Sequence, residues 1–431
     1  MAHPLHTSIR SNRAFIDSAR VALGILSFIN LFNYLDRYVV SALVESLKHS
    51  ELALTDAQLG SLMSGFLIVF AAIAPAFGTL GDRYSRPRLI AFGVGCWSIA
   101  TALSGLAGNF AALFAARASV GVGEAAYVTI GPSLLSDYFP RERRGRVMAI
   151  FFCAIPVGSA LGYVIGGLID AHFGWRVAFF VAGIPGIVLA LLCLGLRDPP
   201  RGSQERDAAQ ATRPGSGTRA TYLELLRNTP YVLTILGYAA YTFAMGGLAF
   251  WMPAFLERVR DIPRDQATVS FGKIIVLTGF VGTFAGGWLG DYCAKYSRRA
   301  YLAISAAATL LAVPLAWIAL TAVSSTLYLV CLIVAQLLMF LSTGPINASI
   351  VNLVWPAQRA SANALGVLTI HMLGDVPSPF LIGLVSDATS LSQAVKIVPA
   401  AILVAAAIWI LAARAQPLAP SDATPAQSKA E

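Results

Sequence analysis

The chain has 431 residues, of which 57% are hydrophobic and only 12% are charged. An average soluble domain carries about 25% charged residues, because its surface faces water. The composition therefore excludes an ordinary soluble domain and predicts an integral membrane protein. The net charge of +9 comes from short basic stretches between apolar segments. This distribution argues against nucleic-acid binding and favours a membrane topology signal.

Apolar stretches close to the length that crosses a bilayer, about 20 residues, recur along the chain. We count twelve, which predicts an all-α integral membrane protein with twelve transmembrane helices. The cysteines lie singly, and no phosphate-binding loop or zinc-protease motif is present, so we expect no cofactor, no metal and no enzyme activity. The predicted spans cover residues 21–47, 58–80, 89–107, 110–137, 147–169, 175–196, 229–256, 268–290, 300–321, 325–350, 361–385 and 393–413.

Basic residues between the spans predict the orientation of the chain, because arginine and lysine accumulate on the cytoplasmic side. They follow the second, fourth and eighth spans, so we expect these loops and both termini to be cytoplasmic. The polar N-terminus lacks the apolar core of a cleaved signal peptide, and short external loops favour a bacterial inner (cytoplasmic) membrane. The residues that carry the signal are Arg83, Arg86, Arg88, Arg141, Arg143, Arg144, Arg146, Lys295, Arg298 and Arg299.

One connection is much longer than the others and is rich in Gly, Pro, Ser, Ala and Arg, which is typical of a flexible linker. It separates six spans from six. The Pro- and Ala-rich C-terminal end is predicted to be disordered. The expected parts are a cytoplasmic N-terminal segment (1–20), an N-terminal six-helix bundle (21–197), a cytoplasmic linker (198–228), a C-terminal six-helix bundle (229–413) and a cytoplasmic tail (414–431).

A short motif occurs once in each half. The second span ends in GTLGDRYSR (78–86), and the eighth ends in GWLGDYCAKYSR (287–298). The first resembles the signature loop of the major facilitator superfamily, and the second is similar to its weaker copy. The resemblance implies a major facilitator fold with two six-helix pseudo-repeats and substrate held between them. In that family the loop latches the cytoplasmic side, so the implied gating residues are Gly78, Asp82, Arg83, Arg86 and Asp291.

The second copy differs from the family pattern, because Tyr292 follows Asp291 where Arg83 follows Asp82. We expect its gating contacts to be weaker or to be made through Lys295, Arg298 and Arg299. A topology signal alone would explain the arginines, but not the matched Gly and Asp.

Five further segments resemble the Spinster-like transporters. The resemblance implies alternating access and proton-coupled export of an amphipathic lipid such as a lysophospholipid or a sphingoid phosphate. A multidrug, organic-anion or sugar transporter of the same fold is the alternative, and a non-transporting receptor is an alternative of another class. The expected partners are an amphipathic small-molecule or lipid substrate, protons and the bilayer, with a monomeric chain. The segments are 33–40, 117–139, 154–167, 246–256 and 371–387.

Four charged residues lie inside predicted spans, where each costs at least about 2.5 to 3.5 kcal/mol and is therefore a functional candidate. They are Asp36 and Arg37 in the first span, and Arg117 and Glu124 in the fourth. The fourth-span pair is spaced i, i+7 and lies on one helical face, so the two charges could share a partner. Asn33 precedes Arg37 by four residues and could hydrogen-bond it.

Burial raises the pKa of a carboxyl group and a nearby arginine lowers it, so an acid that loses its arginine becomes protonatable. We hypothesise that Asp36 and Glu124 exchange Arg117 during the transport cycle, which would couple transport to protons. A static ion pair between the two spans is the alternative.

His371 and Asp375, spaced i, i+4, could form a second proton site, although a packing pair is the simpler interpretation. Gly158, Gly162 and Gly166 recur every four residues and predict a face for close helix packing. Several aromatic residues could line a substrate cavity, although most aromatics in such helices are packing or interfacial residues. These candidates are Tyr34, Tyr127, Tyr238, Tyr241 and Trp251.

Overall fold

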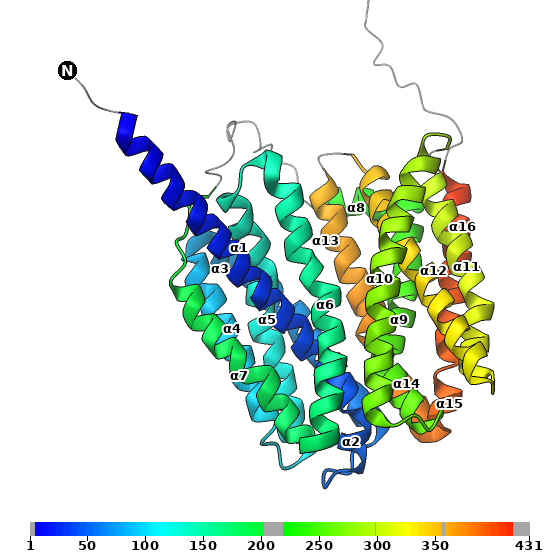
Figure 1. Ribbon diagram of the computed structural model, residues 1–431. Helices are drawn as coiled ribbons and strands as arrows, with labels where there is room; N and C mark the ends of the chain where they lie inside the picture. The colour runs from blue at the N-terminus through cyan, green and yellow to red at the C-terminus, as the bar shows by residue number, and fades with distance from the viewer. Residues whose placement is uncertain (1–4, 202–218, 298, 356–357, 417–431) are drawn as a thin grey trace, which may run out of the picture. The chain divides into compact units, whose positions relative to one another are not determined.

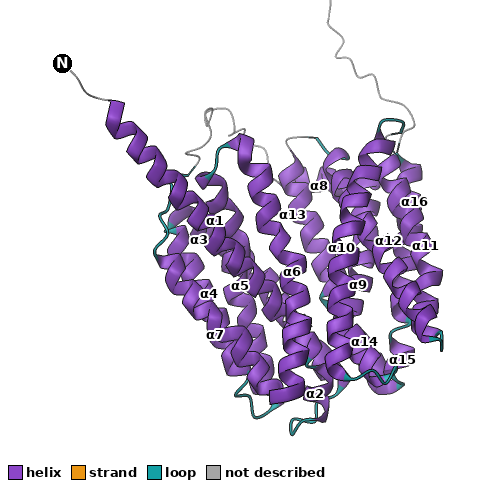
Figure 2. Cartoon of the chain, viewed as in Figure 1, coloured by secondary structure: helices purple, strands orange, loops and turns teal. Residues whose placement is uncertain are grey.

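The computed structural model describes residues 5–201, 219–297, 299–355 and 358–416, and within these ranges every regular element is a helix (Figure 2). The middle of the predicted linker, Arg298 and most of the predicted tail lie outside the described residues. The elements (Figure 1) are α1 (Leu5–Ala42), α2 (Val44–His49), α3 (Asp56–Arg83), α4 (Arg86–Ser104), α5 (Phe110–Tyr138), α6 (Arg141–Phe173), α7 (Trp175–Leu194), α8 (Arg219–Arg227), α9 (Thr229–Arg258), α10 (Arg264–Ala294), α11 (Ala300–Thr321), α12 (Ser325–Asn352), α13 (Arg359–Ile370), η3 (His371–Asp375), α14 (Pro377–Ala388), α15 (Leu391–Ala394) and α16 (Ile397–Ala415).

Every predicted span overlaps one of these helices or a consecutive group of them, although α1 begins at Leu5 rather than at residue 21. In the described part of the chain, nine helical segments are long and apolar enough to cross a membrane. The other three predicted spans correspond to α1, α4 and α5, whose apolar sequences include arginines or acidic residues. Charged residues inside a helix of this length mark positions that the protein interior must satisfy.

The first, eleventh and twelfth predicted spans are interrupted in ways that the hydropathy pattern does not reveal, and the twelfth breaks between α15 and α16. The first is continued beyond Ala42 by the short helix α2. The eleventh consists of α13, one π-helical turn (η3) and α14, and the turn is closed by the Val376 amide, which donates to the His371 carbonyl at 3.2 Å. A π turn is frequent at functional sites because it shifts the side chains that follow it.

The chain forms two compact units. Unit 1 comprises Met1–Pro214, Thr242–Leu277 and His371–Val398, and unit 2 comprises Gly215–Tyr241, Thr278–Ile370 and Pro399–Glu431. Helices α9 and α10 contribute to both. Unit 1 therefore contains α1 to α7 together with segments from the second half of the chain.

Within unit 1, the glycine face of α6 packs directly against α1, as predicted. A Cβ atom on Gly158 would lie 2.4 Å from the Leu31 carbonyl oxygen, and one on Gly162 would lie 2.6 Å from that of Leu35. Only glycine permits this approach of two helix backbones. In a membrane such packing stabilises helix contacts that hydrophobic burial alone cannot drive.

Helix α5 is buried among α1, α3 and α4 because small residues let each neighbour approach. A Cβ on Gly121 would meet the Phe66 carbonyl of α3 at 2.5 Å, and one on Gly123 would meet the Gly93 carbonyl of α4 at 2.3 Å. The charged residues of α5 are consequently held in the interior of unit 1, close to α1, rather than facing lipid.

Unit 2 has a core of aromatic and hydroxyl side chains. Trp409 of α16 donates from its indole nitrogen to the Thr234 carbonyl at 3.1 Å and lies 5.5 Å from the ring of Tyr241. Thr309 of α11 and Ser342 of α12 share a hydrogen bond of 3.0 Å. Interhelical bonds of this kind satisfy polar groups that lipid cannot.

Candidate transport site

A buried ion pair joins the first predicted span to the fourth. The Arg117 Nη1 atom donates to Asp36 Oδ1 at 3.0 Å, and the two side chains are 2% and 1% exposed. The second oxygen of Asp36 accepts a hydrogen bond of 2.7 Å from the hydroxyl of Thr101 on α4. Asp36 therefore has a partner on each carboxylate oxygen.

A second ion pair joins the same two helices. The Arg37 Nη2 atom donates to Glu124 Oε2 at 2.8 Å, and the Glu124 side chain is fully buried. The guanidinium carbon of Arg37 lies 4.9 Å from the ring centre of Tyr34, 5.1 Å from Phe66 and 5.6 Å from Phe70. Aromatic faces at these distances attract a cation electrostatically.

The structure thus brings all four predicted charges together, but in two separate pairs. Arg117 binds Asp36 and Arg37 binds Glu124, so the two charged residues of α5 do not share a partner here. Asn33 is fully buried, and neither atom of its amide has a hydrogen-bond partner among the described residues.

Antiparallel packing of α1 and α5 explains why the two pairs form. The Tyr127 hydroxyl donates to the Leu26 carbonyl at 2.5 Å, and ten residues along each helix Arg117 meets Asp36. Since Asp36 and Arg37 are adjacent, they point about 100° apart and reach different partners on α5. Each pair interacts electrostatically with the other.

His371 and Asp375 form the expected i, i+4 contact in η3, with Nδ1 lying 2.9 Å from Oδ1. Both side chains are partly exposed. The His371 ring meets Phe70 edge-on at 6.3 Å, and Phe70 also faces Arg37. The His371–Asp375 contact and the Arg37–Glu124 ion pair are therefore linked through the ring of Phe70.

The five aromatic candidates have different environments. Tyr34 contacts Arg37 as described. Tyr127 is buried with its hydroxyl bonded to α1, and Trp251 is buried and donates to the Pro379 carbonyl at 3.0 Å. Tyr238 and Tyr241 belong to unit 2, where their rings lie 5.8 Å apart. The Tyr241 hydroxyl donates to the Met339 carbonyl at 2.8 Å.

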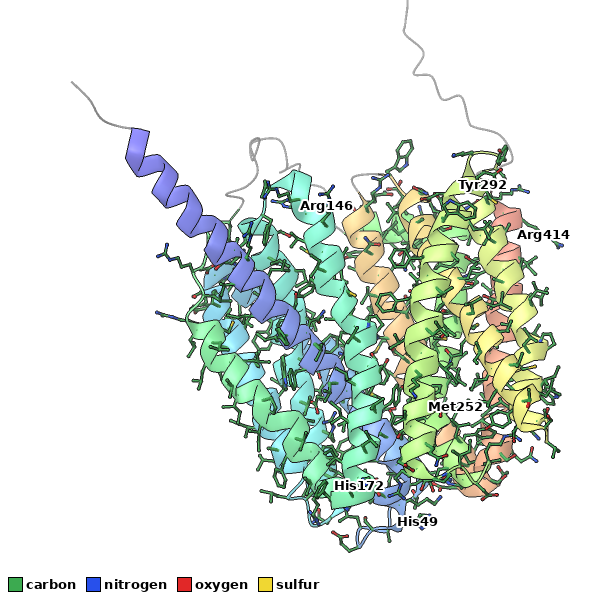
Figure 3. All side chains as sticks on the ribbon, viewed as in Figure 1. His49, Arg146, His172, Met252, Tyr292 and Arg414 are labelled. Carbon is green, nitrogen blue, oxygen red and sulfur yellow. The ribbon has the colours of Figure 1, made fainter. Side chains whose placement is uncertain are left out.

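A cluster of charges lies at one end of unit 1, and we call its residues Glu45, Lys48, Asp56 and Arg258 the end clamp. Arg258 donates to Asp56 Oδ2 at 2.6 Å and to Glu45 Oε1 at 2.5 Å, while Lys48 donates to Asp56 Oδ1 at 2.7 Å. Figure 3 shows His49, next to Lys48, and His172 at this end of unit 1 and Arg146 at the opposite end. The clamp therefore lies away from the arginine-rich loops.

The end clamp ties the first half of the chain to segments from the second half. Asp387 of α14 accepts hydrogen bonds of 2.8 Å from the backbone amides of Asp56 and Ala57, at the N-terminus of α3. An anionic group is favoured at this position by the free amides and the helix dipole. Nearby, Arg264 of α10 binds Asp170 of α6 at 3.0 Å.

The first copy of the signature loop is anchored by Arg86, which is 2% exposed. Its guanidinium donates to Asp137 at 2.5 Å, to Asp198 at 2.8 Å and to the Pro199 carbonyl at 2.6 Å. Gly78 faces Thr129 of α5, with room for ordinary contact. Asp82 and Arg83 are exposed.

The second copy of the loop has different contacts. Asp291 is exposed and accepts a hydrogen bond of 2.9 Å from the Tyr301 hydroxyl. Tyr292 stacks on Trp288 at 5.9 Å, and the Lys295 amine lies 5.8 Å from the Tyr292 ring centre. Arg299 donates to the Gln416 carbonyl at 2.7 Å, beyond the end of α16.

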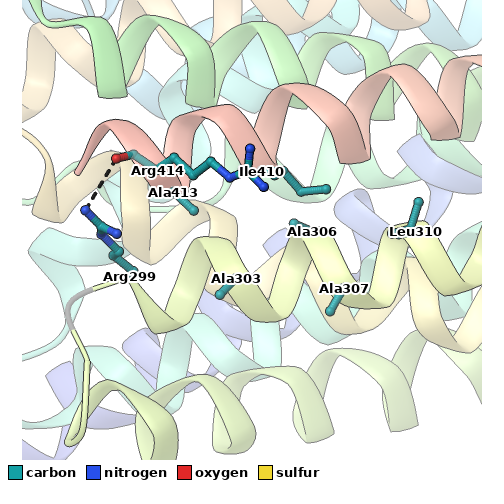
Figure 4. Close-up of a pocket in the computed structure, with 8 residues that line it drawn as sticks. All are labelled: Arg299, Ala303, Ala306, Ala307, Leu310, Ile410, Ala413 and Arg414. Carbon is teal, nitrogen blue, oxygen red and sulfur yellow. Dashed lines mark hydrogen bonds between the residues drawn. The ribbon is translucent and has the colours of Figure 1, made fainter. Parts of the chain in front are cut away.

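A separate cavity of about 330 Å³ lies in unit 2 between α11 and α16 (Figure 4). Its walls are apolar apart from Arg299 and Arg414, and Arg299 is the one residue among them that was predicted as a possible gating contact. In the described part of the chain, no group of three or more His, Cys, Asp or Glu side chains could hold a metal ion.

Several residues of this arrangement were not predicted from the sequence. Thr101 looks like an ordinary polar residue of a membrane helix. The acidic and basic residues of the end clamp lie at the ends of predicted spans, where charges are common. Asp198 begins the predicted linker, and only its position directly after the sixth span, as in the sequence LRDPPR, could have indicated a structural role.

The comparisons with known proteins agree with this fold. The sequence model of the family described as the Major Facilitator Superfamily matches residues 26–379 of the chain. Protein spinster of Drosophila melanogaster is 35% identical over 376 residues, which are 84% of this chain and 61% of that protein. Protein spinster homolog 1 of Mus musculus is 34% identical over 381 residues, covering 84% and 72%. The chain thus spans about three fifths of the Drosophila relative and almost three quarters of the mouse one.

Among solved structures, a bacterial homolog of the human lysosomal transporter Spinster, in an inward-facing and occupied conformation, superposes with a TM-score of 0.81. It is 23% identical, and the match covers 93% of this chain and 98% of that one. The fold and the matches define a member of the major facilitator superfamily of membrane transporters. Within that superfamily, the chain belongs to the Spinster family.

Proposed function

We propose that this protein is a proton-coupled secondary transporter that works by alternating access and moves an amphipathic lipid, such as a lysophospholipid or a sphingoid phosphate. The observation that carries the proposal is the Arg37–Glu124 pair. It is a buried ion pair in which one carboxylate oxygen of Glu124 is bonded and the other has no partner among the described residues.

Protonation of Glu124 would remove the negative charge that holds Arg37. The guanidinium, which cannot itself lose a proton at physiological pH, would then be available to an anionic headgroup, and guanidinium groups bind phosphate well. The rings of Tyr34, Phe66 and Phe70 beside it offer an apolar surface for the rest of an amphiphile. Exchange of Arg117 between Asp36 and Glu124 is the accompanying step that we propose.

The end clamp is the part of unit 1 that we propose opens and closes during the transport cycle. Arg258 joins Glu45 and Asp56 through several charge-assisted hydrogen bonds, which are the stronger kind. Opening that end of unit 1 requires these bonds to break, so we assign the clamp the role of a gate on the non-cytoplasmic side. The protein would lie in the inner membrane with both termini cytoplasmic.

The direct test is uptake of a labelled lysophospholipid into proteoliposomes, with and without a pH gradient, by the wild type and by Glu124→Gln. We expect gradient-driven flux in the wild type and its loss in the variant. Glu51→Gln is the matched control, because Glu51 is an exposed carboxylate paired with Arg176 at the surface, and surface pairs contribute little. Normal gradient-driven flux in Glu124→Gln would remove Glu124 from the mechanism.

The alternatives predict other outcomes of the same assay. A transporter for drugs, organic anions or sugars would show gradient-driven flux of those solutes and none of the lysophospholipid. A receptor would bind a ligand that never crosses the vesicle membrane.

A further inference from the structure

The buried polar atoms without a hydrogen-bond partner among the described residues include the Nε atom of Arg37 and four atoms of three other residues on α1, α4 and α5. These four are both amide atoms of Asn33, the hydroxyl of Ser98 and the Oε1 atom of Glu124. All three residues are fully buried. A buried polar atom left unpaired costs about 1 to 3 kcal/mol, so a group of four in one region indicates an unseen partner.

The helix registers bring Asn33 and Ser98 to the same level. Helix α5 runs antiparallel to α1 and also to α4, where Gly93 and Trp97 contact Gly123. Helices α1 and α4 are therefore parallel to each other. Thr101 of α4 contacts Asp36 of α1, and three residues earlier on each helix, on the same face, lie Ser98 and Asn33.

The same reasoning gives the level of Glu124. The contacts of Leu26 with Tyr127 and of Asp36 with Arg117 place residue 29 of α1 opposite the backbone of Glu124, whereas the Glu124 carboxylate reaches Arg37. Asn33 is four residues from each of these two positions, which is about 6 Å along the helix axis. The side chains of Asn33, Ser98 and Glu124 can therefore all contact one small molecule.

We propose that Asn33, Ser98 and Glu124 Oε1 hold ordered water inside the helices of unit 1, and that this water delivers the proton to Glu124. A water needs two to four polar partners, and an amide, a hydroxyl and a carboxylate oxygen supply them. The water passes one of its protons to Oε1 as it takes up another from the solvent side. One O–H bond of the water breaks as another forms, so the water stays neutral beside Arg37.

This inference rests on the proposed role of Glu124 and specifies how its proton arrives. The neighbouring cation Arg37 disfavours a metal ion at the site and favours a neutral ligand. Asn33 and Ser98 are positioning residues, since they act through the water. The charged and titratable groups around Glu124 are Tyr34, Asp36 and Arg37 of α1, Arg117 of α5, and, beyond Phe70, His371 and Asp375 of η3.

The test is infrared difference spectroscopy of the full-length protein in lipid nanodiscs, in which the carboxyl C=O band of Glu124 is identified by its absence from Glu124→Gln. In Asn33→Leu we expect the band to shift to higher frequency, because the carboxyl loses a hydrogen bond. We also expect its hydrogen–deuterium exchange to slow by roughly tenfold or more, since positioned proton donors typically accelerate transfer by at least that factor.

Gln336→Leu is the matched control, because Gln336 is also a buried amide with neither atom partnered among the described residues, but it belongs to unit 2. Ser98→Ala is the second variant and stays informative if Asn33→Leu does not fold. Unchanged exchange in Asn33→Leu and Ser98→Ala, or no Glu124 band at any pH at which the protein is stable, would overturn the proposal. Because this readout does not require transport, it is independent of the flux result for Glu124→Gln.

Discussion

The two copies of the signature loop are equivalent in sequence position but not in chemistry. In the first, Arg86 is buried and bonded to two carboxylates and a carbonyl. In the second, Asp291 is exposed with one hydrogen bond from Tyr301, and Tyr292 stacks on Trp288. The first copy is an ionic anchor, whereas the second is an exposed aromatic cluster.

The two copies share one feature. In each, an arginine at the end of the loop bonds to the chain at the end of the last helix in the same half. Arg86 binds Asp198 and Pro199, just beyond α7. Arg299 binds the Arg414 and Gln416 carbonyls at the end of α16. The connection is therefore kept in both halves, although it is made by a charge pair in one and by backbone carbonyls in the other.

The largest effect is expected for Arg86→Ala, which breaks the anchor of the first copy. Removing one partner of a buried ion pair leaves the other charge uncompensated and costs about 3 to 5 kcal/mol. We expect a large fall in the thermal unfolding midpoint of the purified protein. Arg83→Ala is the control, because Arg83 is exposed and should leave the midpoint nearly unchanged. Equal midpoints for the two variants would contradict the anchor.

The helices and the four central charges could be predicted because each follows from one property of the local sequence. An apolar run of about 20 residues has few alternatives to a membrane helix, and a charge inside it must be satisfied. The pairing could not be predicted. Whether Glu124 meets Arg117 or Arg37 depends on the register of α1 against α5, which is set by close glycine contacts such as that of Gly121.

The contacts that hold the loops were missed for a different reason. Asp198 and Asp56 stand at the ends of spans, where a charge is satisfied by water as readily as by protein. Only the fold brings Arg86 and Arg258 to them. Hydropathy also cannot reveal the π turn at His371, because it changes the backbone hydrogen bonds and not the composition.

A medium effect is expected for Asp198→Ala, which removes the tie to the end of α7 but keeps the Asp137 pair. Asp198 is partly exposed and accepts from both the backbone and the side chain of Arg86, so we expect a loss of about 1 to 2 kcal/mol. Trypsin should then cleave after Arg201 faster, because Arg201 is held against the Gly81 and Tyr84 carbonyls. Asp82→Ala, at an exposed site, should leave that cleavage rate unchanged.

A smaller effect is expected for Arg299→Gln in the second half. The substitution removes charge-assisted bonds to the Gln416 carbonyl from a residue that is only half-buried, so we expect about 1 kcal/mol. Lys295→Gln is the control, because the Lys295 amine contacts only the face of an exposed ring in the structure described. A loss as large as that of Arg86→Ala would mean that the two halves are anchored equally strongly.

The smallest effect is expected for Tyr301→Phe, which removes the hydrogen bond to Asp291 and keeps the ring. Asp291 is exposed and water can replace the hydroxyl, so the loss should be about 0.5 kcal/mol or less. The ring itself packs near Gly290, so Tyr301→Ala should cost more than Tyr301→Phe. Loss of transport in Tyr301→Phe with an unchanged unfolding midpoint would instead show that Asp291 is a gating residue despite its exposure. The difference between the buried first copy and the exposed second copy would then concern stability and not gating.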